Sequence, residues 1–149
     1  MSEREWSDRI AIIAVLDAYA EAVDRRRFED LEEVFAEDIE FDYGPDWQVV
    51  GRKLAIERIA ASLAHCGPTQ HLQGNYRVEV DGDQARSRTY VRAFHVGIGA
   101  ARGKTYEMGG HCRDAFARID GAWRMTRRVG RMIFEAGTTE VLAPGGGAG

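Results

Sequence analysis

Apolar residues recur at helical spacing in the first part of the chain and alternate with polar residues in the second part. In residues 7–24 they fall on one stripe, which predicts an amphipathic helix with Ser7 as its N-cap. The same spacing predicts a short helix around residues 28–35 and another over 52–63. Between these two, residues 38–43 alternate with period two and predict a strand.

After residue 67 the pattern is that of long strands. We expect strands over 70–80, 84–98, 104–119 and 122–134, separated by glycine-containing turns. Helices followed by long antiparallel strands predict an α+β fold. The expected architecture is a curved antiparallel sheet wrapped around the N-terminal helices, with a pocket between the layers. We expect one domain over residues 1–142 and a flexible Gly-rich tail over 143–149.

Composition excludes several classes of function. With 149 residues, of which 44% are hydrophobic and 30% charged, the chain can bury a core of ordinary size. A net charge of −4 gives no general attraction to nucleic acid, and no apolar run approaches the roughly 20 residues of a membrane span. The N-terminus lacks the apolar segment of a signal peptide. Cys66 and Cys112 show no metal-ligand spacing and suit a reducing cytoplasm, so we expect a cytoplasmic protein without a metal.

The last predicted hairpin can be read residue by residue. Asp120-Gly121 is a strong two-residue turn signal. Pairing outward from that turn sets Phe116 opposite Met125 and Asp114 opposite Arg127, on the face that also carries Cys112. Because that face is otherwise apolar, we expect it to be the inner one, with Arg128 pointing outward. The Asp114–Arg127 pair is then either a structural ion pair or part of a site.

Three histidines take different positions in the predicted sheet. Val91 and His95 share a face with inward-pointing valines, and His95 is either a core histidine or a site residue. Simple alternation places His71 on the outer face, but a one-residue bulge near Gly74 would turn it inward. His111 falls on the face opposite Cys112, so we expect it to be structural or exposed.

Asp24 and His71 are the candidate catalytic pair. A carboxylate held against an imidazole makes a general base that works near neutral pH. An acid at the C-terminus of a helix is mildly unfavourable, so the position of Asp24 calls for a reason. The residues taken alone favour the structural interpretation, in which Asp24 is an ordinary salt-bridge acid and His71 a strand-end histidine.

Four segments carry a resemblance to a known family: Ala22-Val23-Asp24, Phe28 to Asp38, Thr69 to Asn75, and Gly109-Gly110 through Asp120 to Met125. Together they resemble the SnoaL-like branch of the nuclear transport factor 2-like superfamily. The likeness covers about residues 7–135, and the chain is most similar to the group of scytalone dehydratase, bile acid 7-alpha-dehydratase and hexachlorocyclohexane dehydrochlorinase. This resemblance implies a cone-shaped α+β barrel with a deep apolar pocket, an Asp–His dyad at Asp24 and His71, and no cofactor. It also implies a homo-oligomer, a trimer in preference to a dimer.

The resemblance also assigns roles to further residues. Tyr19 matches a polar pocket residue, Arg127 a cation on the last strand, His95 a second histidine and Trp47 a loop aromatic. Asp114 departs from the neutral polar residue that relatives often carry. The expected substrate-binding residues are Trp47, Tyr43, Val91, Cys112, Asp114, Phe116 and Met125.

These residues lead to one hypothesis and two alternatives. The hypothesis is a cofactor-independent lyase that eliminates water from a hydrophobic cyclic molecule such as a steroid, terpenoid or polyketide. A polyketide cyclase or a ketosteroid-type isomerase could use the same pocket. A non-catalytic module that binds a small ligand or another protein is the remaining alternative.

Overall fold

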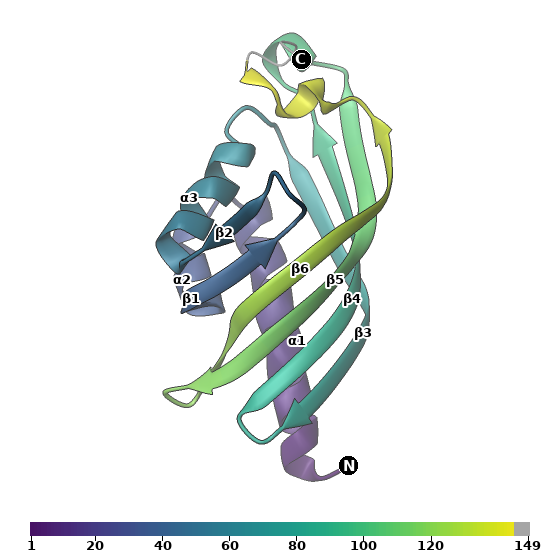
Figure 1. Cartoon of the computed structure of the whole chain (residues 1–149). Coiled ribbons are helices and arrows are strands. Elements are labelled where there is room, and N and C mark those ends of the chain that lie inside the picture. The colour runs from purple at the N-terminus through teal and green to yellow at the C-terminus, as the bar shows by residue number, and fades with distance from the viewer. Residues whose placement is uncertain (145–149) are drawn as a thin grey trace.

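The computed structural model describes residues 1–144 and has the expected α+β architecture (Figure 1). Within these residues three α-helices accompany a sheet of six strands. The elements are α1 (Glu3–Asp24), α2 (Leu31–Val34), β1 (Phe35–Asp42), β2 (Gln48–Val50), α3 (Arg52–Ser62), β3 (Thr69–Asp81), β4 (Gln84–Val96), β5 (Thr105–Ile119) and β6 (Ala122–Gly137). Short 3₁₀ turns occur at Phe28–Asp30, Gly99–Ala101 and Thr139–Leu142.

The six strands form one curved, unclosed sheet in the order β2-β1-β6-β5-β4-β3. Strands β3 to β6 form an antiparallel meander, as expected. Strand β1, however, runs parallel to β6, so the prediction of an antiparallel sheet is wrong for this pairing. The reason is topological: α3 and four strands separate β1 from β6 in the chain, so no hairpin fixes their relative direction.

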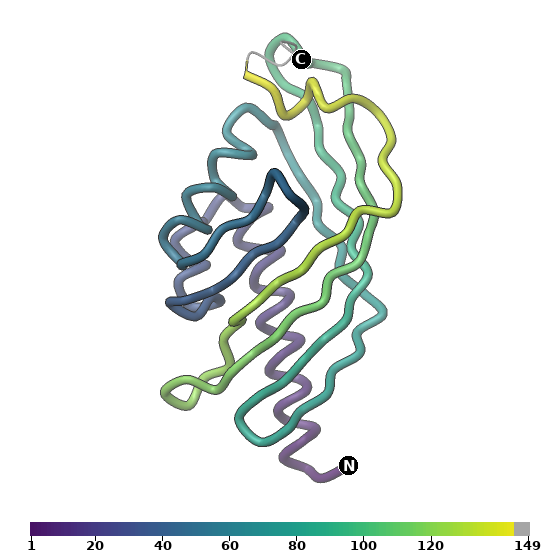
Figure 2. The backbone as a smooth tube through the Cα atoms, in the orientation of Figure 1, coloured from purple at the N-terminus to yellow at the C-terminus, as the bar shows by residue number. Residues whose placement is uncertain are grey.

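Helix α1 lies along one face of the meander, as Figures 1 and 2 show. Its apolar stripe, including Ile12, Leu16 and Val23, is buried. The helix begins at Glu3 rather than after Ser7, because Ser2 and Glu5 form a capping box in which each side chain accepts a hydrogen bond from the other residue's backbone N–H.

One part of the packed core lies at the end of the fold nearest the β5–β6 turn. Phe35, Phe116 and Met125 are fully buried there. Towards the other end of β5 and β6 the inward positions are occupied by smaller or more flexible residues, Gly110, Met108 and Met132. This change in side-chain size leaves room for a cavity between α1 and the sheet.

A bulge in β3 decides which residues face the helices. The register of β3 against β4 shifts between Gly74 and Arg77, and Asn75 adopts a left-handed φ of 52°. Because the bulge inserts one extra residue, His71 points to the same side as the buried Val78 further along the strand. The predicted bulge near Gly74 is therefore confirmed.

A second bulge, in β6, corrects the predicted register of the last hairpin. Phe116 pairs with Met125 as expected, but Ala115 pairs with Arg127, so Thr126 is an extra residue in β6. Asp114 consequently lies opposite Arg128, and Arg128 is the buried arginine. The prediction that Arg127 faces inward is wrong. Its guanidinium lies on the exposed side, 3.5 Å from the Glu40 carboxylate.

Three simpler expectations concern the chain as a whole. None of the helices in residues 1–144 combines the length and the apolar character needed to cross a membrane. Cys66 and Cys112 are both buried and form no disulfide. The predicted flexible tail over 143–149 lies, from residue 145 onward, outside the described residues.

Candidate active site

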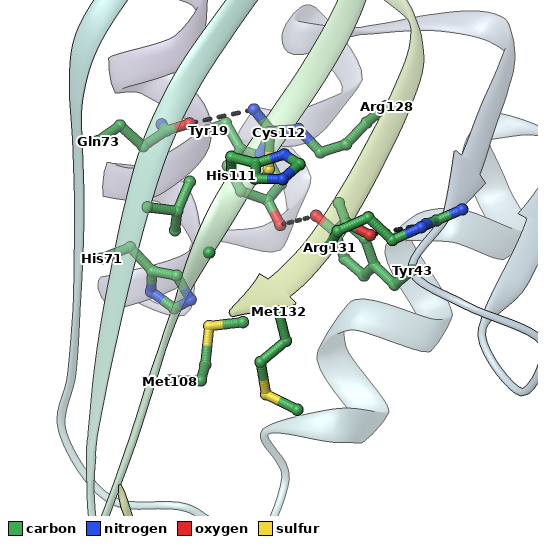
Figure 3. A pocket seen from close by; sticks show the side chains of 13 residues that line it. Tyr19, Tyr43, His71, Gln73, Met108, His111, Cys112, Arg128, Arg131 and Met132 are labelled. Atoms are coloured by element: carbon green, nitrogen blue, oxygen red, sulfur yellow. Dashed lines mark hydrogen bonds between the residues drawn. The ribbon is translucent and has the colours of Figure 1, made fainter. Parts of the chain in front are cut away.

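A cavity with a volume of about 250 Å³ lies between α1 and the concave face of the sheet (Figure 3). It combines hydroxyl, imidazole and guanidinium groups with apolar side chains, as ligand sites in proteins commonly do. Its lining residues are Tyr19, Tyr43, His71, Gln73, Val91, Met108, Gly110, His111, Cys112, Arg128, Gly130, Arg131 and Met132.

Asp24 and His71 meet at the wall of this cavity. The last residue of α1 and the beginning of β3 bring the Nδ1 atom of His71 to 2.6 Å from Oδ1 of Asp24. The backbone N–H of His71 donates to Oδ2 of the same carboxylate at 2.8 Å. Since an ionised carboxylate only accepts, Nδ1 carries the proton, and Nε2 is left as the basic nitrogen of the ring.

The carboxylate of Asp24 is held in its charged form. Burial alone would raise the pKa of Asp24, but hydrogen bonds from the ring and backbone of His71 outweigh it and lower that pKa. The Thr69 hydroxyl contributes a further hydrogen bond, donated to Oδ1 at 3.0 Å. A carboxylate that stays ionised at neutral pH is what an orienting partner for the imidazole requires.

Two tyrosine hydroxyls face each other on the opposite side of the cavity. The hydroxyl of Tyr19, from α1, lies 3.3 Å from that of Tyr43, which follows β1 (Figure 3). Burial raises the pKa of both phenols, so both are protonated at neutral pH. In any such pair one hydroxyl donates to the other, which leaves the second proton free to bond a ligand oxygen.

A buried ion pair supports the floor of the cavity. The guanidinium of Arg128 binds both oxygens of Asp114, with Nε–Oδ1 at 2.8 Å and Nη2–Oδ2 at 3.0 Å. It also donates to the side-chain oxygen of Gln73 and lies over the Tyr19 ring, 4.5 Å from its centroid. The Asp114–arginine contact was anticipated as either a structural pair or part of a site. The arginine is Arg128 rather than Arg127. Its contact with Asp114 is a buried structural ion pair, and Arg128 also lines the cavity.

His95 lies behind the dyad rather than in the cavity lining. Its ring centroid is 5.8 Å from that of His71, and its Nδ1–H donates to the Tyr106 carbonyl oxygen at 3.1 Å. The side chain faces inward and is buried, as expected. Burial lowers the pKa of His95 and keeps the ring neutral, so it is poorly suited to protonate a leaving group.

The predicted substrate-binding residues divide into two groups. Tyr43, Val91 and Cys112 line the cavity. Four others do not: Phe116 and Met125 are core residues, Asp114 lies behind Arg128, and Trp47 packs on Tyr43 with ring centroids 4.9 Å apart. Phe116 and Met125 do not reach the cavity because they lie close to the β5–β6 turn, where the helix and the sheet are fully packed.

Several lining residues were missed from the sequence. Gln73 could have been found, because the bulge that turns His71 inward also turns the residue two positions later. Met108 follows from alternation with Cys112. His111 was expected to be structural or exposed, yet it is half-buried and belongs to the lining. Arg128 was missed because no glycine marks the bulge at Thr126.

Within the described part of the chain, no three His, Cys, Asp or Glu side chains are grouped closely enough to hold a metal ion. The polar groups that the chain itself brings to this site are an imidazole, a carboxylate, two phenols and a guanidinium.

The sequence matches a known family. The model of the SnoaL-like domain matches residues 4–129, so the chain belongs to the SnoaL-like family, and the predicted membership of the nuclear transport factor 2-like superfamily is confirmed. In sequence, the chain is 36% identical over 137 residues to the uncharacterized protein Rv2910c of Mycobacterium tuberculosis, covering 91% of this chain and 92% of that protein.

Two solved structures share the fold. One is a proposed scytalone dehydratase from Novosphingobium aromaticivorans, with a TM-score of 0.83, 23% identity and 91% of each chain covered. The other is a hexachlorocyclohexane dehydrochlorinase, LinA-type3, from Novosphingobium barchaimii. It has a TM-score of 0.78 and 18% identity, and the match covers 91% of this chain and 92% of that one. At these identities the likeness concerns the fold alone.

Proposed function

We propose that this protein is a cofactor-independent lyase of dehydratase type, acting on a hydrophobic cyclic small molecule. The observation that carries the proposal is the 2.6 Å contact between Nδ1 of His71 and the Asp24 carboxylate at the wall of the cavity. The names of the two enzymes that share the fold, a proposed dehydratase and a dehydrochlorinase, agree with an elimination.

The proposed reaction begins with His71. Nε2 removes a proton from a carbon next to a carbon that bears a hydroxyl group, and Asp24 stabilises the imidazolium that forms. The electron pair of the C–H bond becomes a C=C double bond as the C–O bond breaks. His71 passes its proton to the departing hydroxyl, so that water leaves and the base is regenerated. Neither Arg127 nor His95 has a part in this scheme, since one is outside the cavity and the other is held neutral.

The tyrosine pair and Arg128 supply the electrostatic part of the mechanism. If the carbon acid lies next to a carbonyl group, negative charge develops on that oxygen as the proton is removed. The free hydroxyl proton of the Tyr19–Tyr43 pair is placed to bond it. Arg128, buried and beside Tyr19, adds positive potential to the same wall.

The size of the cavity narrows the class of substrate. About 250 Å³ lies slightly below the roughly 300–1,000 Å³ typical of sites for drug-sized ligands. Val91, Met108 and Met132 provide apolar surface, and methionine adapts to irregular shapes. We therefore favour compact hydroxylated cyclic ketones, of terpenoid or polyketide type, over larger steroids.

A substrate screen tests this proposal. Hydroxylated cyclic ketones are incubated with the protein, and products that have lost the mass of water are sought by mass spectrometry. His71→Ala should lower turnover by roughly 10²–10⁴-fold, and Asp24→Asn should also lower it strongly. His65→Ala, which removes an exposed histidine outside the cavity, is the matched control. Unchanged turnover in both dyad variants would exclude the proposed mechanism.

A second candidate is a polyketide cyclase or ketosteroid-type isomerase. The Tyr19–Tyr43 hydroxyl pair favours it, because such donors stabilise an enolate whether or not a group then leaves. An isomerase returns the proton to another carbon, so its product keeps the mass of the substrate. A module that only binds its ligand would show affinity in the same screen without any product.

We also propose that the protein is a homo-oligomer, a trimer in preference to a dimer. Large apolar side chains are exposed on the outer face of the sheet, where patches of this kind mark interaction surfaces. Arg92 lies over the Phe134 ring there and pairs with Glu107, so two copies of this surface can meet without like-charge repulsion. The surface consists of Leu72, Tyr90, Phe94, Ile133 and Phe134.

Light scattering after size-exclusion chromatography tests this assembly. Leu72→Asp combined with Phe134→Asp should shift the mass to that of a monomer. Ile10→Asp, at an exposed apolar residue of α1, should leave it unchanged. A monomeric wild-type protein would contradict the proposal.

The two buried, unpaired cysteines agree with a reducing compartment, and we propose the cytoplasm.

A further inference from the structure

Helix α1 ends in an arrangement that normally calls for glycine. The N–H of Arg26 donates to the Val23 carbonyl, and the N–H of Arg27 donates to the Ala22 carbonyl. These two bonds define a Schellman motif, in which the residue at the position of Arg26 adopts a left-handed conformation. Its φ is indeed 57°. An L-residue with a long side chain is strained there, which suggests that the Arg26 side chain has a role that offsets the strain.

The guanidinium of Arg26 reaches the segment that leads into β3. Nη2 donates to the Gly67 carbonyl oxygen at 2.6 Å, and Nη1 donates to Oγ1 of Thr69 at 2.8 Å. Nη1 also bonds the Val23 carbonyl at 2.9 Å. The side chain therefore ties the end of α1 to the strand that carries His71.

The direction of these hydrogen bonds is fixed by chemistry. Arginine only donates, so Thr69 Oγ1 must accept from Arg26, and its single O–H proton remains to be donated. That proton goes to Oδ1 of Asp24 at 3.0 Å, the oxygen that also accepts from the His71 ring. A chain of hydrogen bonds thus runs from Arg26 through Thr69 and Asp24 to His71.

The route through Thr69 matters for the carboxylate. A direct two-point pair with Arg26 would occupy both oxygens of Asp24, which are needed by the ring and the backbone N–H of His71. No ion pair joins Arg26 to Asp24 within the described residues. The guanidinium of Arg26 therefore acts on Asp24 only through the Thr69 hydroxyl, and both carboxylate oxygens stay bonded to His71.

We propose that Arg26 is a positioning residue of the dyad, which orients the Thr69 hydroxyl onto Asp24 and thereby holds His71 in the Nδ1–H tautomer with Nε2 free. The role rests on the proposed function, because only a base at His71 needs that tautomer. Arg26 itself does not line the cavity. By analogy with other residues that support catalytic groups, its loss should lower turnover by roughly 10–100-fold.

Arg26→Gly separates this role from a purely structural one. Glycine is the preferred residue at a left-handed helix end, so this variant keeps the backbone and removes the guanidinium. Thr69→Val removes the relaying hydroxyl at nearly constant shape, and Thr69→Ser retains it. Arg25→Ala is the matched control, because Arg25 is exposed, pairs with Glu21 and does not touch the relay.

The decisive measurement is ¹⁵N NMR of the His71 ring at neutral pH, which distinguishes the two tautomers without any substrate. Wild type, Thr69→Ser and Arg25→Ala should show the Nδ1–H form. Arg26→Gly and Thr69→Val should show a mixture of tautomers, because an Asp24 carboxylate that Thr69 no longer holds can turn away from Nδ1 of His71. The Asp24 carboxyl, followed by ¹³C NMR, should titrate at higher pH in the latter two proteins. A pure Nδ1–H form in folded Arg26→Gly would overturn the proposal and leave Arg26 as a clamp of the helix end.

Failure of the proposed function gives a different result. If the tautomer changes as expected but no substrate is turned over by wild type, the positioning role stands and the lyase proposal fails. If wild type is active and Arg26→Gly is equally active with an unchanged tautomer, the lyase proposal stands and the positioning role fails.

Discussion

Arg128 and Asp114 form a two-point ion pair that is almost wholly shielded from water, with side-chain exposures of 1% and 0%. Such a pair is weak evidence for stability, but removing one partner leaves an uncompensated buried charge. We expect Arg128→Met to lower the free energy of unfolding by about 3–5 kcal/mol. Urea denaturation followed by tryptophan fluorescence measures this loss.

The double variant Arg128→Met with Asp114→Leu provides the control. It replaces both charges by apolar groups and should recover most of the lost stability. A double variant as unstable as Arg128→Met alone would show that the arginine acts through its contacts with Gln73 and Tyr19 rather than through its charge on Asp114.

The Tyr43 ring can occupy its position in the cavity because residue 130 is a glycine. The ring lies so close to Gly130 that a Cβ added there would come within 2.6 Å of two ring atoms. We expect Gly130→Ala to displace the Tyr43 ring, to break its hydroxyl contact with Tyr19 and to destabilise the protein by about 1–3 kcal/mol, as overpacking usually does.

A double-mutant cycle tests this cause. In a Tyr43→Ala background the ring is absent, so adding Gly130→Ala should cost nearly nothing in the free energy of unfolding. An equal cost in both backgrounds, measured by urea denaturation, would place the strain in the β6 backbone and not in the Tyr43 ring.

Asp8 connects the first part of α1 to the end of the sheet at the β5–β6 turn. Its Oδ1 accepts from the Trp123 indole N–H at 3.0 Å and from Arg118 Nη2 at 2.8 Å. Asp8→Ala should leave the buried indole N–H without a partner and lower the free energy of unfolding by roughly 1–3 kcal/mol. Asp8→Asn, which keeps an acceptor oxygen, should cost less.

Asp83→Ala is the matched control for Asp8. Asp83 binds the same Arg118, at 2.9 Å from Nε, but its side chain is mostly exposed. Ion pairs at the surface contribute little, so this variant should change stability by less than about 1 kcal/mol. Equal losses for both aspartates would mean that the arginine, and not the buried indole, makes Asp8 important.

The two bulges show what the sequence could predict about the site. Gly74 stands inside a strand pattern, and glycine at such a position marks a bulge, so the inward position of His71 could be predicted. Thr126 is β-branched, and nothing in its neighbourhood distinguishes a bulged strand from a regular one. One extra residue there exchanged the roles of Arg127 and Arg128, because a slip of one position moves a side chain to the other face.

For the fold, too, the sequence predicts only those features that a local pattern of residues determines. Helical spacing and alternation predict the helices and the meander, because each of these elements is stabilised by its own periodic burial. The parallel pairing of β1 with β6 and the contact between Tyr19 and Tyr43 depend on where a loop and an edge strand pack in three dimensions. No spacing in the chain encodes those contacts.

Burial of His95 makes the free energy of unfolding depend on pH as the pH falls below about 6.5. Burial lowers the pKa of His95 in the folded protein, while in the unfolded chain a histidine titrates near 6.5. The unfolded state therefore binds more protons as the pH falls through 6.5, and the free energy of unfolding decreases, by at most about 1.4 kcal/mol per pH unit for one group. Carboxylates such as Asp24, whose pKa is lowered, add their own loss only at more acidic pH.

His95→Asn isolates this contribution. The amide N–H of asparagine can donate to the Tyr106 carbonyl as Nδ1–H does, but the side chain does not titrate. In urea denaturation at a series of pH values from 7 to 5, the variant should lose less stability than wild type. His65→Asn, at an exposed histidine in a loop, should follow the wild-type slope. If the free energy of unfolding depended on pH identically in wild type and His95→Asn, the buried ring would take up a proton in the folded protein as easily as in the unfolded chain. That result would contradict the prediction.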